Sequence, residues 1–339
     1  MDWKTQRCLV TGGASFIGSH LTERLVALGA QVRVVDNLSS GKKIYLSNVL
    51  NQIEFINDDL INLDAAKRSM QNIDRVFHLA ADHGGRGYIA THPASCCGNM
   101  ALDNIVLRSA AEGGVKHITF ASSACVYPTD IQTDKTLLKE SFVSFKERGG
   151  AFADEEYGWA KLMGELSTQA HYKQYGLKAA IARLSTVYGP RENESHALVA
   201  LVAKAFIRQS PFEIWGDGNQ TRGFTYVDDI VNGLILSSEH IYDASAVNLG
   251  TDEFISLNQI ASTIFEQLGW QPPLGIKHQH NKPVGVVHRA LDYSNTQAKT
   301  GWAPHTSLEK GIANTINWYF KNNDISVVKN NLEQKLLSR

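Results

Sequence analysis

Short apolar segments rich in β-branched residues alternate with longer segments of helical periodicity over the first half of the chain. The apolar segments lie at residues 7–11, 31–36, 53–57, 75–81, 117–123 and 179–185. Between the first two, Leu21, Leu25 and Leu28 share one face of a helix. Strands and helices that alternate in this way form parallel sheets with crossover helices. The pattern therefore predicts an α/β fold with a doubly wound parallel sheet.

The alternation ends near Tyr188, and the rest of the chain is less regular. Residues 197–209 and 256–269 have helical periodicity, and short strands with Pro and Gly turns surround them. We therefore expect two domains. Residues 1–185 form the sheet domain, to which 224–250 return. Residues 186–223 and 251–330 form a smaller mixed α/β domain over the carboxyl edge of the sheet.

Composition and charge exclude several classes of protein. The chain has 339 residues and a formal net charge of −1, without the basic excess of a nucleic-acid-binding protein. Its most apolar stretch, residues 196–207, is too short to span a bilayer and contains Lys204. The first strand begins at Arg7, which argues against a signal peptide, and the four cysteines lack metal-type pairing with histidines. We expect a cytoplasmic protein with reduced thiols, no metal and no membrane partner.

The segment LVTGGASFIGSH, residues 9–20, is typical of a turn that binds a dinucleotide pyrophosphate. Gly12 permits the tight turn and Gly18 permits close helix packing, while the helix N-terminus offers N–H groups and a positive dipole end. Ser15 stands at the position where such turns usually have their middle glycine. A serine fits there if its φ angle is negative, and its hydroxyl can donate to a phosphate oxygen. The alternative interpretation is a structural turn without a ligand.

Asp36 ends the second predicted strand, about twenty residues after the glycines. A carboxylate there accepts hydrogen bonds from the adenosine ribose and repels a 2′-phosphate, so the sequence predicts a Rossmann domain that binds NAD rather than NADP. Lys42 and Lys43 nearby soften this preference, and an acidic strand end is the alternative interpretation. The residues that we predict to contact NAD are Gly12, Ser15, Phe16, Ile17, Gly18, Asp36, Asn37, Asp59, Leu60, Leu79, Ala80, Ala81, Asn99, Tyr157 and Lys161.

Tyr157 and Lys161 stand at positions i and i+4 of a predicted helix, and Ser123 ends a predicted strand. A neighbouring ammonium and a positive nicotinamide ring would lower the pKa of the Tyr157 phenol, which is ordinarily near 10. A phenolate can take a hydroxyl proton while hydride leaves the same carbon for NAD⁺, and Ser123 can polarise that oxygen. The sequence thus predicts a centre that oxidises an alcohol, although Tyr-x-x-x-Lys alone is also common on surface helices.

Together these motifs resemble the extended short-chain dehydrogenase/reductase family. The resemblance rests on the glycine turn, Asp36, HLAA at 78–81, SSACVY at 122–127, the Tyr157–Lys161 pair, RGFTYVDDI at 222–230 and GWAPHTSLEKGI at 301–312. It implies an epimerase, dehydratase, decarboxylase or reductase that acts on a nucleotide-diphosphate sugar. It also implies a homodimer that pairs through the helix after Asn99 and the helix containing Tyr157.

Three segments resemble the GDP-mannose 3,5-epimerase branch of this family more closely, namely residues 80–89, 121–128 and 212–229. In that branch a C4 ketone acidifies the C3 and C5 protons, and a cysteine and a lysine on opposite ring faces move them. Cys125 matches the cysteine, whereas His196 stands at the lysine position, and histidine can act as acid or base near neutral pH. The resemblance therefore assigns catalysis to Tyr157, Lys161, Ser123, Cys125 and His196. A buried thiol and a solvated histidine at a helix start are the alternatives for the last two.

The resemblance also implies contacts to the nucleotide sugar. Arginine suits bidentate contacts to phosphate. Thr186 stands where many relatives have a substrate-contacting asparagine, so no contact is carried over to it. The predicted substrate-binding residues are Gly84, Gly85, Arg86, Ser123, Ala124, Cys125, Lys204, Gln220, Arg222 and Arg289.

The sequence leaves four functions open, of which we favour an NAD-dependent nucleotide-sugar epimerase that exchanges protons at C3 and C5. A UDP-sugar 4-epimerase would need only the tyrosine, lysine and serine set. A dehydratase is possible, but Ala124-Cys125 stands where 4,6-dehydratases usually carry Asp-Glu. A non-catalytic NAD(H) sensor on the same fold would have no use for Tyr157, Lys161 and Ser123.

Overall fold

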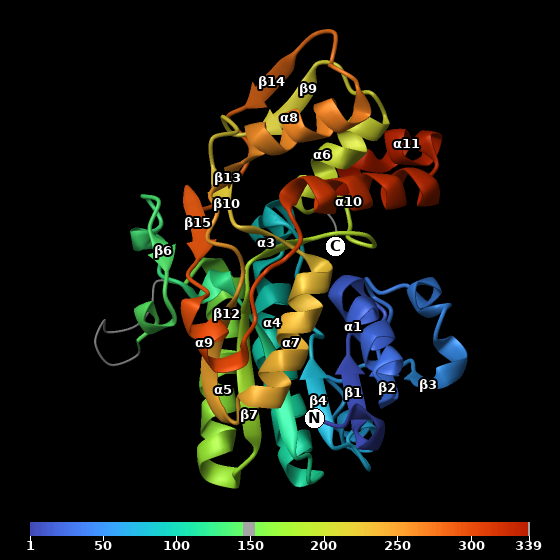
Figure 1. The fold of residues 1–339 in the computed structure, drawn as a ribbon, viewed down its shortest axis with the longest axis vertical. Coiled ribbons are helices and arrows are strands. Elements are labelled where there is room, and N and C mark those ends of the chain that lie inside the picture. The colour runs from blue at the N-terminus through green and yellow to red at the C-terminus, as the bar shows by residue number, and fades with distance from the viewer. Residues whose placement is uncertain (145–152, 338–339) are drawn as a thin grey trace.

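The computed structural model describes residues 1–144 and 153–337, and within them the main sheet has seven parallel strands (Figure 1). The strand order is β12-β7-β5-β4-β1-β2-β3. The strands are β1 (Arg7–Thr11), β2 (Gln31–Val35), β3 (Ile53–Ile56), β4 (Arg75–His78), β5 (His117–Ser123), β7 (Lys178–Leu184) and β12 (Asp243–Leu249). The first six were predicted from the apolar segments, and the structure confirms both them and the doubly wound sheet.

Successive residues of a central strand alternate between two apolar cores, and one core lies on each face of the sheet. Val10 and Phe77 belong to the core that contains helices α1 and α7, whereas Leu9 and Val76 belong to the core that contains α2 and α4. This alternation follows from the two-residue repeat of a strand that is buried on both faces. The helices are α1 (Phe16–Ala27) and α7 (Val227–His240) on one face, and α2 (Leu63–Ser69), α4 (Pro93–Glu112) and α5 (Glu155–Tyr175) on the other.

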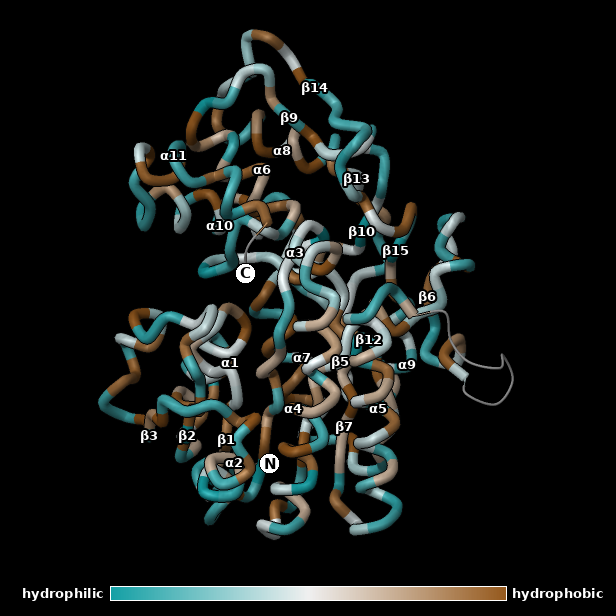
Figure 2. The backbone as a smooth tube through the Cα atoms, turned by 180° about the vertical axis from the view of Figure 1, so that it is seen from behind, coloured by the Kyte–Doolittle hydropathy of each residue, from teal (hydrophilic) through white to brown (hydrophobic). Residues whose placement is uncertain are grey.

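A smaller mixed α/β part lies beyond the carboxyl ends of the strands, at the top of Figure 1. Its helices are α6 (Ala197–Phe206), α8 (Leu257–Leu268), α10 (Leu308–Asn322) and α11 (Ile325–Lys335). Its strands are β9 (Phe212–Trp215), β10 (Thr221–Arg222), β13 (Ile255–Ser256), β14 (Ile276–Gln279) and β15 (His288–Leu291). Hydrophobic segments along α6 and α8 are visible in Figure 2, and their buried residues extend the core that contains α1 and α7.

The remaining helices and strands of the described residues are short. They are α3 (Arg86–Thr91), α9 (Ser294–Thr300), β6 (Leu137–Leu138), β8 (Thr186–Tyr188), β11 (Phe224–Tyr226) and the 3₁₀ helices Trp3–Thr5, Lys43–Leu46, Leu50–Gln52, Ala124–Val126, Thr129–Ile131 and Glu140–Phe142. Strand β6 pairs with β15, and β12 joins the main sheet beside β7, so the chain crosses between the parts more than once. The division after residue 185 stays a prediction.

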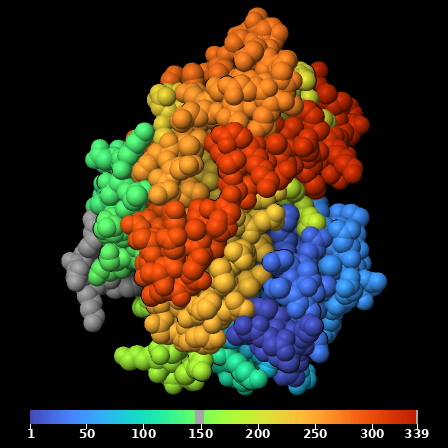
Figure 3. All heavy atoms as spheres, viewed as in Figure 1, coloured from blue at the N-terminus to red at the C-terminus, as the bar shows by residue number. Residues whose placement is uncertain are grey.

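The C-terminal helices lie above the N-terminal segments on the face seen in Figure 3, where red atoms stand over blue ones. Among residues 1–144 and 153–337, no helix has the length and hydropathy to cross a membrane. A cavity of about 840 Å³ lies between the carboxyl edge of the sheet and the smaller part, and its walls come from β2, β5, α1, α5, α6 and the loops around them. Ligands of doubly wound sheets bind at this edge.

Candidate active site

The glycine turn has the backbone that the sequence requires. Gly12 has φ +68°, whereas Ser15 is the extended N-cap residue of α1 with φ −90°. A Cβ atom on Gly18 would lie 2.1 Å from the carbonyl oxygen of Gly12, so the helix packs against the turn only because glycine stands there. No side chain caps α1, and its first turn lines the cavity. This cradle fits the pyrophosphate of a dinucleotide.

The Ser15 hydroxyl donates to the carbonyl oxygen of Gly12 at 2.6 Å, which ties the turn together. Asp36, at the end of β2, accepts from the backbone N–H groups of Ala14 and Leu38 at 2.9 and 2.8 Å. Burial raises the pKa of Asp36, and these two hydrogen bonds partly oppose it. Because Asp36 also lines the cavity, its carboxylate is positioned to accept hydrogen bonds from a ribose.

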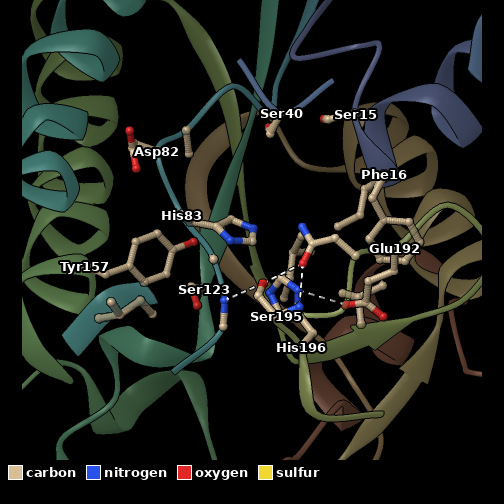
Figure 4. A pocket seen from close by; sticks show the side chains of 18 of the residues that line it. Ser15, Phe16, Ser40, Asp82, His83, Ser123, Tyr157, Glu192, Ser195 and His196 are labelled. Atoms are coloured by element: carbon tan, nitrogen blue, oxygen red, sulfur yellow. Dashed lines mark hydrogen bonds and ion pairs between the residues drawn. The ribbon is translucent and has the colours of Figure 1, made fainter. Parts of the chain in front are cut away.

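Tyr157 and Lys161 project from the first turns of α5 toward the end of β5 (Figure 4 shows Tyr157 beside Ser123). Burial raises the pKa of Tyr157 above its usual range, and a hydrogen bond from Ser123 lowers it only in part. Burial lowers the pKa of Lys161, whereas Asp103 and Glu165 raise it. Without a bound cofactor, burial and the charges of Cys125 and Asp103 thus keep the pKa of Tyr157 raised. The lowering of this pKa by Lys161 and a positive nicotinamide ring stays a prediction.

Three arginines gather around one carboxylate beside Cys125. Asp154 accepts from Arg86 at 2.6 Å and from Arg289 at 2.7 Å, and Arg289 also donates to the sulfur of Cys125 at 3.2 Å. Burial, together with the charges of Arg289 and Arg86, lowers the pKa of Arg222 to about 9. The cluster thus carries an excess of positive charge, which suits a phosphate or diphosphate.

His196 is the N-cap residue of α6, and its ring enters the cavity rather than bulk solvent. Its Nδ1 atom lies 3.4 Å from Oε1 of Glu192, four residues earlier in the loop before α6. Burial, together with the charge of His83, lowers the pKa of His196 to about 3. Burial also raises the pKa of Glu192. His196 is therefore a neutral imidazole at neutral pH and can accept a proton.

The glycine-rich loop at residues 83–86 contacts the His196 segment directly. The backbone N–H of Gly85 donates to the hydroxyl of Ser195 at 3.1 Å, and a Cβ on Gly85 would lie 1.7 Å from the Ser195 carbonyl oxygen. This contact brings the rings of His83 and His196 to a centroid distance of 5.3 Å, and that of His83 lies 5.6 Å from the Tyr157 ring (Figure 4).

Sequence reasoning missed three residues of the site, namely His83, Asp154 and Glu192. His83 stands inside the distinctive loop at 80–89, and Asp154 precedes Tyr157 by three residues. Glu192 precedes His196 by four residues, a spacing that could have suggested an ion pair. Only Glu192 therefore had a local signal, because the partners of His83 and Asp154 come from distant segments.

All the residues that the sequence assigned to the site line this one cavity. The predicted cofactor residues among them are Gly12, Ser15, Phe16, Ile17, Gly18, Asp36, Asn37, Asp59, Leu60, Leu79, Ala80, Ala81, Asn99, Tyr157 and Lys161. The predicted substrate and proton-transfer residues are Gly84, Gly85, Arg86, Ser123, Ala124, Cys125, His196, Lys204, Gln220, Arg222 and Arg289. Lys204 donates to the carbonyl of Glu213 at 2.7 Å, and burial lowers its pKa to about 8. The role of each residue stays a prediction.

Comparisons with known proteins identify what this chain resembles. The model of the NAD-dependent epimerase/dehydratase family matches residues 8–250. GDP-mannose 3,5-epimerase 1 of Oryza sativa subsp. indica is 33% identical over 319 residues, covering 92% of this chain and 81% of that protein. The putative UDP-glucose 4-epimerase of Methanocaldococcus jannaschii is 30% identical over 322 residues, covering 93% and 99%.

A solved structure extends the likeness to the fold. The UDP-glucose 4-epimerase of Thermotoga maritima, crystallised with UDP-glucose, superimposes with a TM-score of 0.81 at 28% identity. The match covers 93% of this chain and 99% of that one. Both the cofactor part and the smaller part of this chain therefore have counterparts in one enzyme structure.

Proposed function

We propose that this chain, which belongs to the NAD-dependent epimerase/dehydratase family and has NAD as its cofactor, is a nucleotide-sugar epimerase that exchanges protons at C3 and C5. The observation that carries the proposal is the presence of Cys125 and His196 in the same cavity as Tyr157 and Ser123. A set that only oxidises and reduces C4 needs no further acid or base at the sugar.

The glycine turn, the N-terminus of α1 and Asp36 would hold NAD across the carboxyl edge of the sheet. When bound, NAD supplies an acceptor for the C4 hydride and later a donor of the same hydride. Lys161 stands one helical turn after Tyr157 on α5, and its ammonium lies 4.9 Å from the Phe120 ring centroid. We propose that its positive charge acts on the phenol of Tyr157.

Tyr157 would accept the proton of the sugar hydroxyl as C4 becomes a ketone, while Ser123 orients that oxygen. Because burial raises the pKa of Tyr157, the phenol must lose its proton through nearby positive charge when substrate and cofactor are bound. In the final step the phenol returns the proton to O4. The reaction then consumes no NAD.

Cys125 and His196 would move the carbon-bound protons while C4 is a ketone. Each C–H bond adjacent to the ketone can break with its electron pair delocalised into an enolate, and a base takes the proton. His196 is neutral at neutral pH and so is available as a base. Arg289 contacts the sulfur of Cys125 and fixes the thiol at the substrate end of the cavity.

The substrate would be a nucleotide-diphosphate sugar whose diphosphate contacts Arg222 and Arg289. GDP-mannose is the first candidate, because the 33% identical rice protein is named for it. We also propose a homodimer that pairs through α4 and α5. Met100, Trp159 and Leu166 are exposed apolar residues on these helices, with 40%, 43% and 42% of their surfaces accessible.

Incubation with GDP-mannose or UDP-glucose in deuterated water tests the function. Deuterium at C3 and C5 supports the proposal, and loss of this incorporation in Cys125→Ala and His196→Ala assigns the two residues. A changed C4 configuration without deuterium would instead identify a 4-epimerase, which the Methanocaldococcus and Thermotoga relatives favour. Loss of water would indicate a dehydratase. Unchanged sugars with a bound-NAD absorbance spectrum would indicate a sensor.

A further inference from the structure

His83 lies between the two proton-transfer centres of the proposed mechanism. Its ring faces Tyr157 edge-on at a centroid distance of 5.6 Å and His196 edge-on at 5.3 Å. Figure 4 shows the three rings around the same part of the cavity, with Glu192 beside His196. His83 is exposed within this cavity, whereas Tyr157 has only 8% of its surface accessible.

The loop that carries His83 is fixed on both sides. Before it, the backbone of Asp82 both accepts from and donates to the Asn99 amide, at 2.8 and 2.6 Å. After it, Gly85 donates to Ser195, the residue next to His196. The position of His83 beside His196 is therefore set by contacts on α4 and on the segment before α6, and not by a freely moving loop.

We infer that His83 is a third proton-transfer residue of this site, which rests on the epimerase function proposed above. In the step that we assign to it, a C–H bond of the ketosugar breaks and leaves its electron pair in the enolate. The proton goes to a ring nitrogen of His196. His196 then gives up a proton, directly or through one water, to a ring nitrogen of His83. The reverse sequence returns a proton to carbon, so charge and atoms balance without another reactant.

The surroundings of His196 explain why it needs such a neighbour. Its Nδ1 faces Glu192, and its ring is enclosed enough that a positive charge on it is strongly disfavoured. A base of this kind captures a proton only briefly and must pass it on. His83 has an exposed side chain on the same cavity, where water can stabilise the imidazolium. The pair thus divides capture and storage of the proton between two imidazoles.

His83→Asn tests the inference by separating two steps that use different residues. After mixing with GDP-mannose in deuterated water, formation of bound NADH reports oxidation by Tyr157, and deuterium in the sugar reports proton exchange. We expect exchange to fall on the order of 10²-fold and NADH formation to stay within about twofold of wild type. Added imidazole should restore part of the exchange. His92→Asn is the matched control, because His92 is an exposed histidine that stacks on Tyr88 outside the cavity lining.

The outcomes distinguish failure of the inference from failure of the proposed function. Wild-type protein without any deuterium incorporation overturns the function and this step with it. Incorporation in wild type with an unchanged rate in His83→Asn overturns the role of His83 alone. An equal fall of NADH formation and exchange also overturns it, because the substitution then acts on oxidation. His83→Gln repeats the test if the asparagine variant unfolds.

Discussion

Arg289 donates one hydrogen bond to the sulfur of Cys125 at 3.2 Å and another to the carboxylate of Asp154 at 2.7 Å. We propose that the Arg289 guanidinium binds the substrate diphosphate, and the same group also holds the Cys125 thiol that we propose for proton exchange. Asp154 in turn accepts from Arg86, so the loop at 83–86, the start of α5 and β15 meet at this carboxylate. Binding of the anion and placement of the thiol are linked through one side chain.

Replacing Arg289 should therefore weaken both binding and exchange. A charge-assisted hydrogen bond contributes about 1.5–3 kcal/mol, so Arg289→Gln should reduce nucleotide-sugar affinity by roughly 10- to 100-fold. Calorimetric titration with GDP-mannose measures this change. Arg24→Gln, at an exposed position on α1, is the control and should bind as wild type does. Equal affinities of Arg289→Gln and wild type would contradict the assignment.

Substitutions at Ser15 should show how the backbone geometry of the glycine turn and the size of the side chain at this position each affect NAD binding. Ser15 has φ −90°, so Ser15→Gly should keep NAD binding within a few-fold, on the order of the small difference between serine and glycine caps. Ser15→Leu should abolish NAD binding. Ser15 lines the cavity, so a large side chain at this position would occupy the space that the pyrophosphate needs. Fluorescence titration with NAD measures both variants. A leucine variant with wild-type affinity would show that the turn holds no pyrophosphate.

The contact between Gly85 and Ser195 should tolerate no side chain. A Cβ at Gly85 would lie 1.7 Å from a backbone carbonyl, so Gly85→Ala should destabilise the protein by about 1–3 kcal/mol. It should also lower deuterium exchange, because His83 and His196 move apart. Gly98→Ala is the control, since nothing lies within 4 Å of its Cβ on helix α4, and it should stabilise by up to about 1 kcal/mol. Chemical denaturation compares the two, and equal stabilities would refute the close contact.

The ion pairs of Asp154 should make stability depend on pH in the acid range. Burial would raise the pKa of Asp154, but Arg289 and Arg86 lower it from 3.8 to about 2. Its contribution is therefore complete above the unfolded value of 3.8 and is lost as pH falls through about 2. The shift corresponds to roughly 2 kcal/mol.

In the wild type, the free energy of unfolding should fall as the pH is lowered from 3.8 to about 2, and Asp154→Asn should make this fall smaller. Denaturant titration at several pH values measures it. The exposed Asp134→Asn should leave the slope unchanged. A slope in Asp154→Asn as steep as in wild type would mean that other carboxylates account for it.

Charge placed on the exposed face of α4 and α5 should break the proposed homodimer. Leu166 has 42% of its surface accessible in one chain, and Leu166→Glu would bury a carboxylate in an α4–α5 interface. Light scattering during size exclusion should then give the monomer mass at micromolar concentration. Leu274→Glu, where the leucine is 72% exposed and distant from these helices, should behave as wild type. A monomeric wild type would exclude this dimer at that concentration.

The main sheet and the residues that line its cavity were predictable because their signals are local. The segments at 7–11 and 117–123 are apolar and β-branched, and each became the expected strand. Tyr157 and Lys161 stand one helical turn apart, so a helix brings them to the same face. The glycine turn could likewise be interpreted from φ requirements alone.

The chemistry between segments could not be predicted in the same way. His83 lies beside His196 because Gly85 contacts Ser195, a pair separated by 110 positions in the chain. The raised pKa of Tyr157 depends on burial by several elements, and a sequence pattern does not measure burial. Asp154 gains its role from arginines that come from two other segments.

Strand β12 completes the main sheet at the edge beyond β7, although it follows β7 by more than fifty residues. Until those residues have been synthesised, the backbone of β7 has an unpaired edge on its outer side. Such an edge, with six of its seven side chains buried in the finished protein, is a template for pairing with other chains. A fragment ending at residue 185 would lack β12 and leave this edge of β7 open, so we expect it to associate with other chains more readily than the whole protein does.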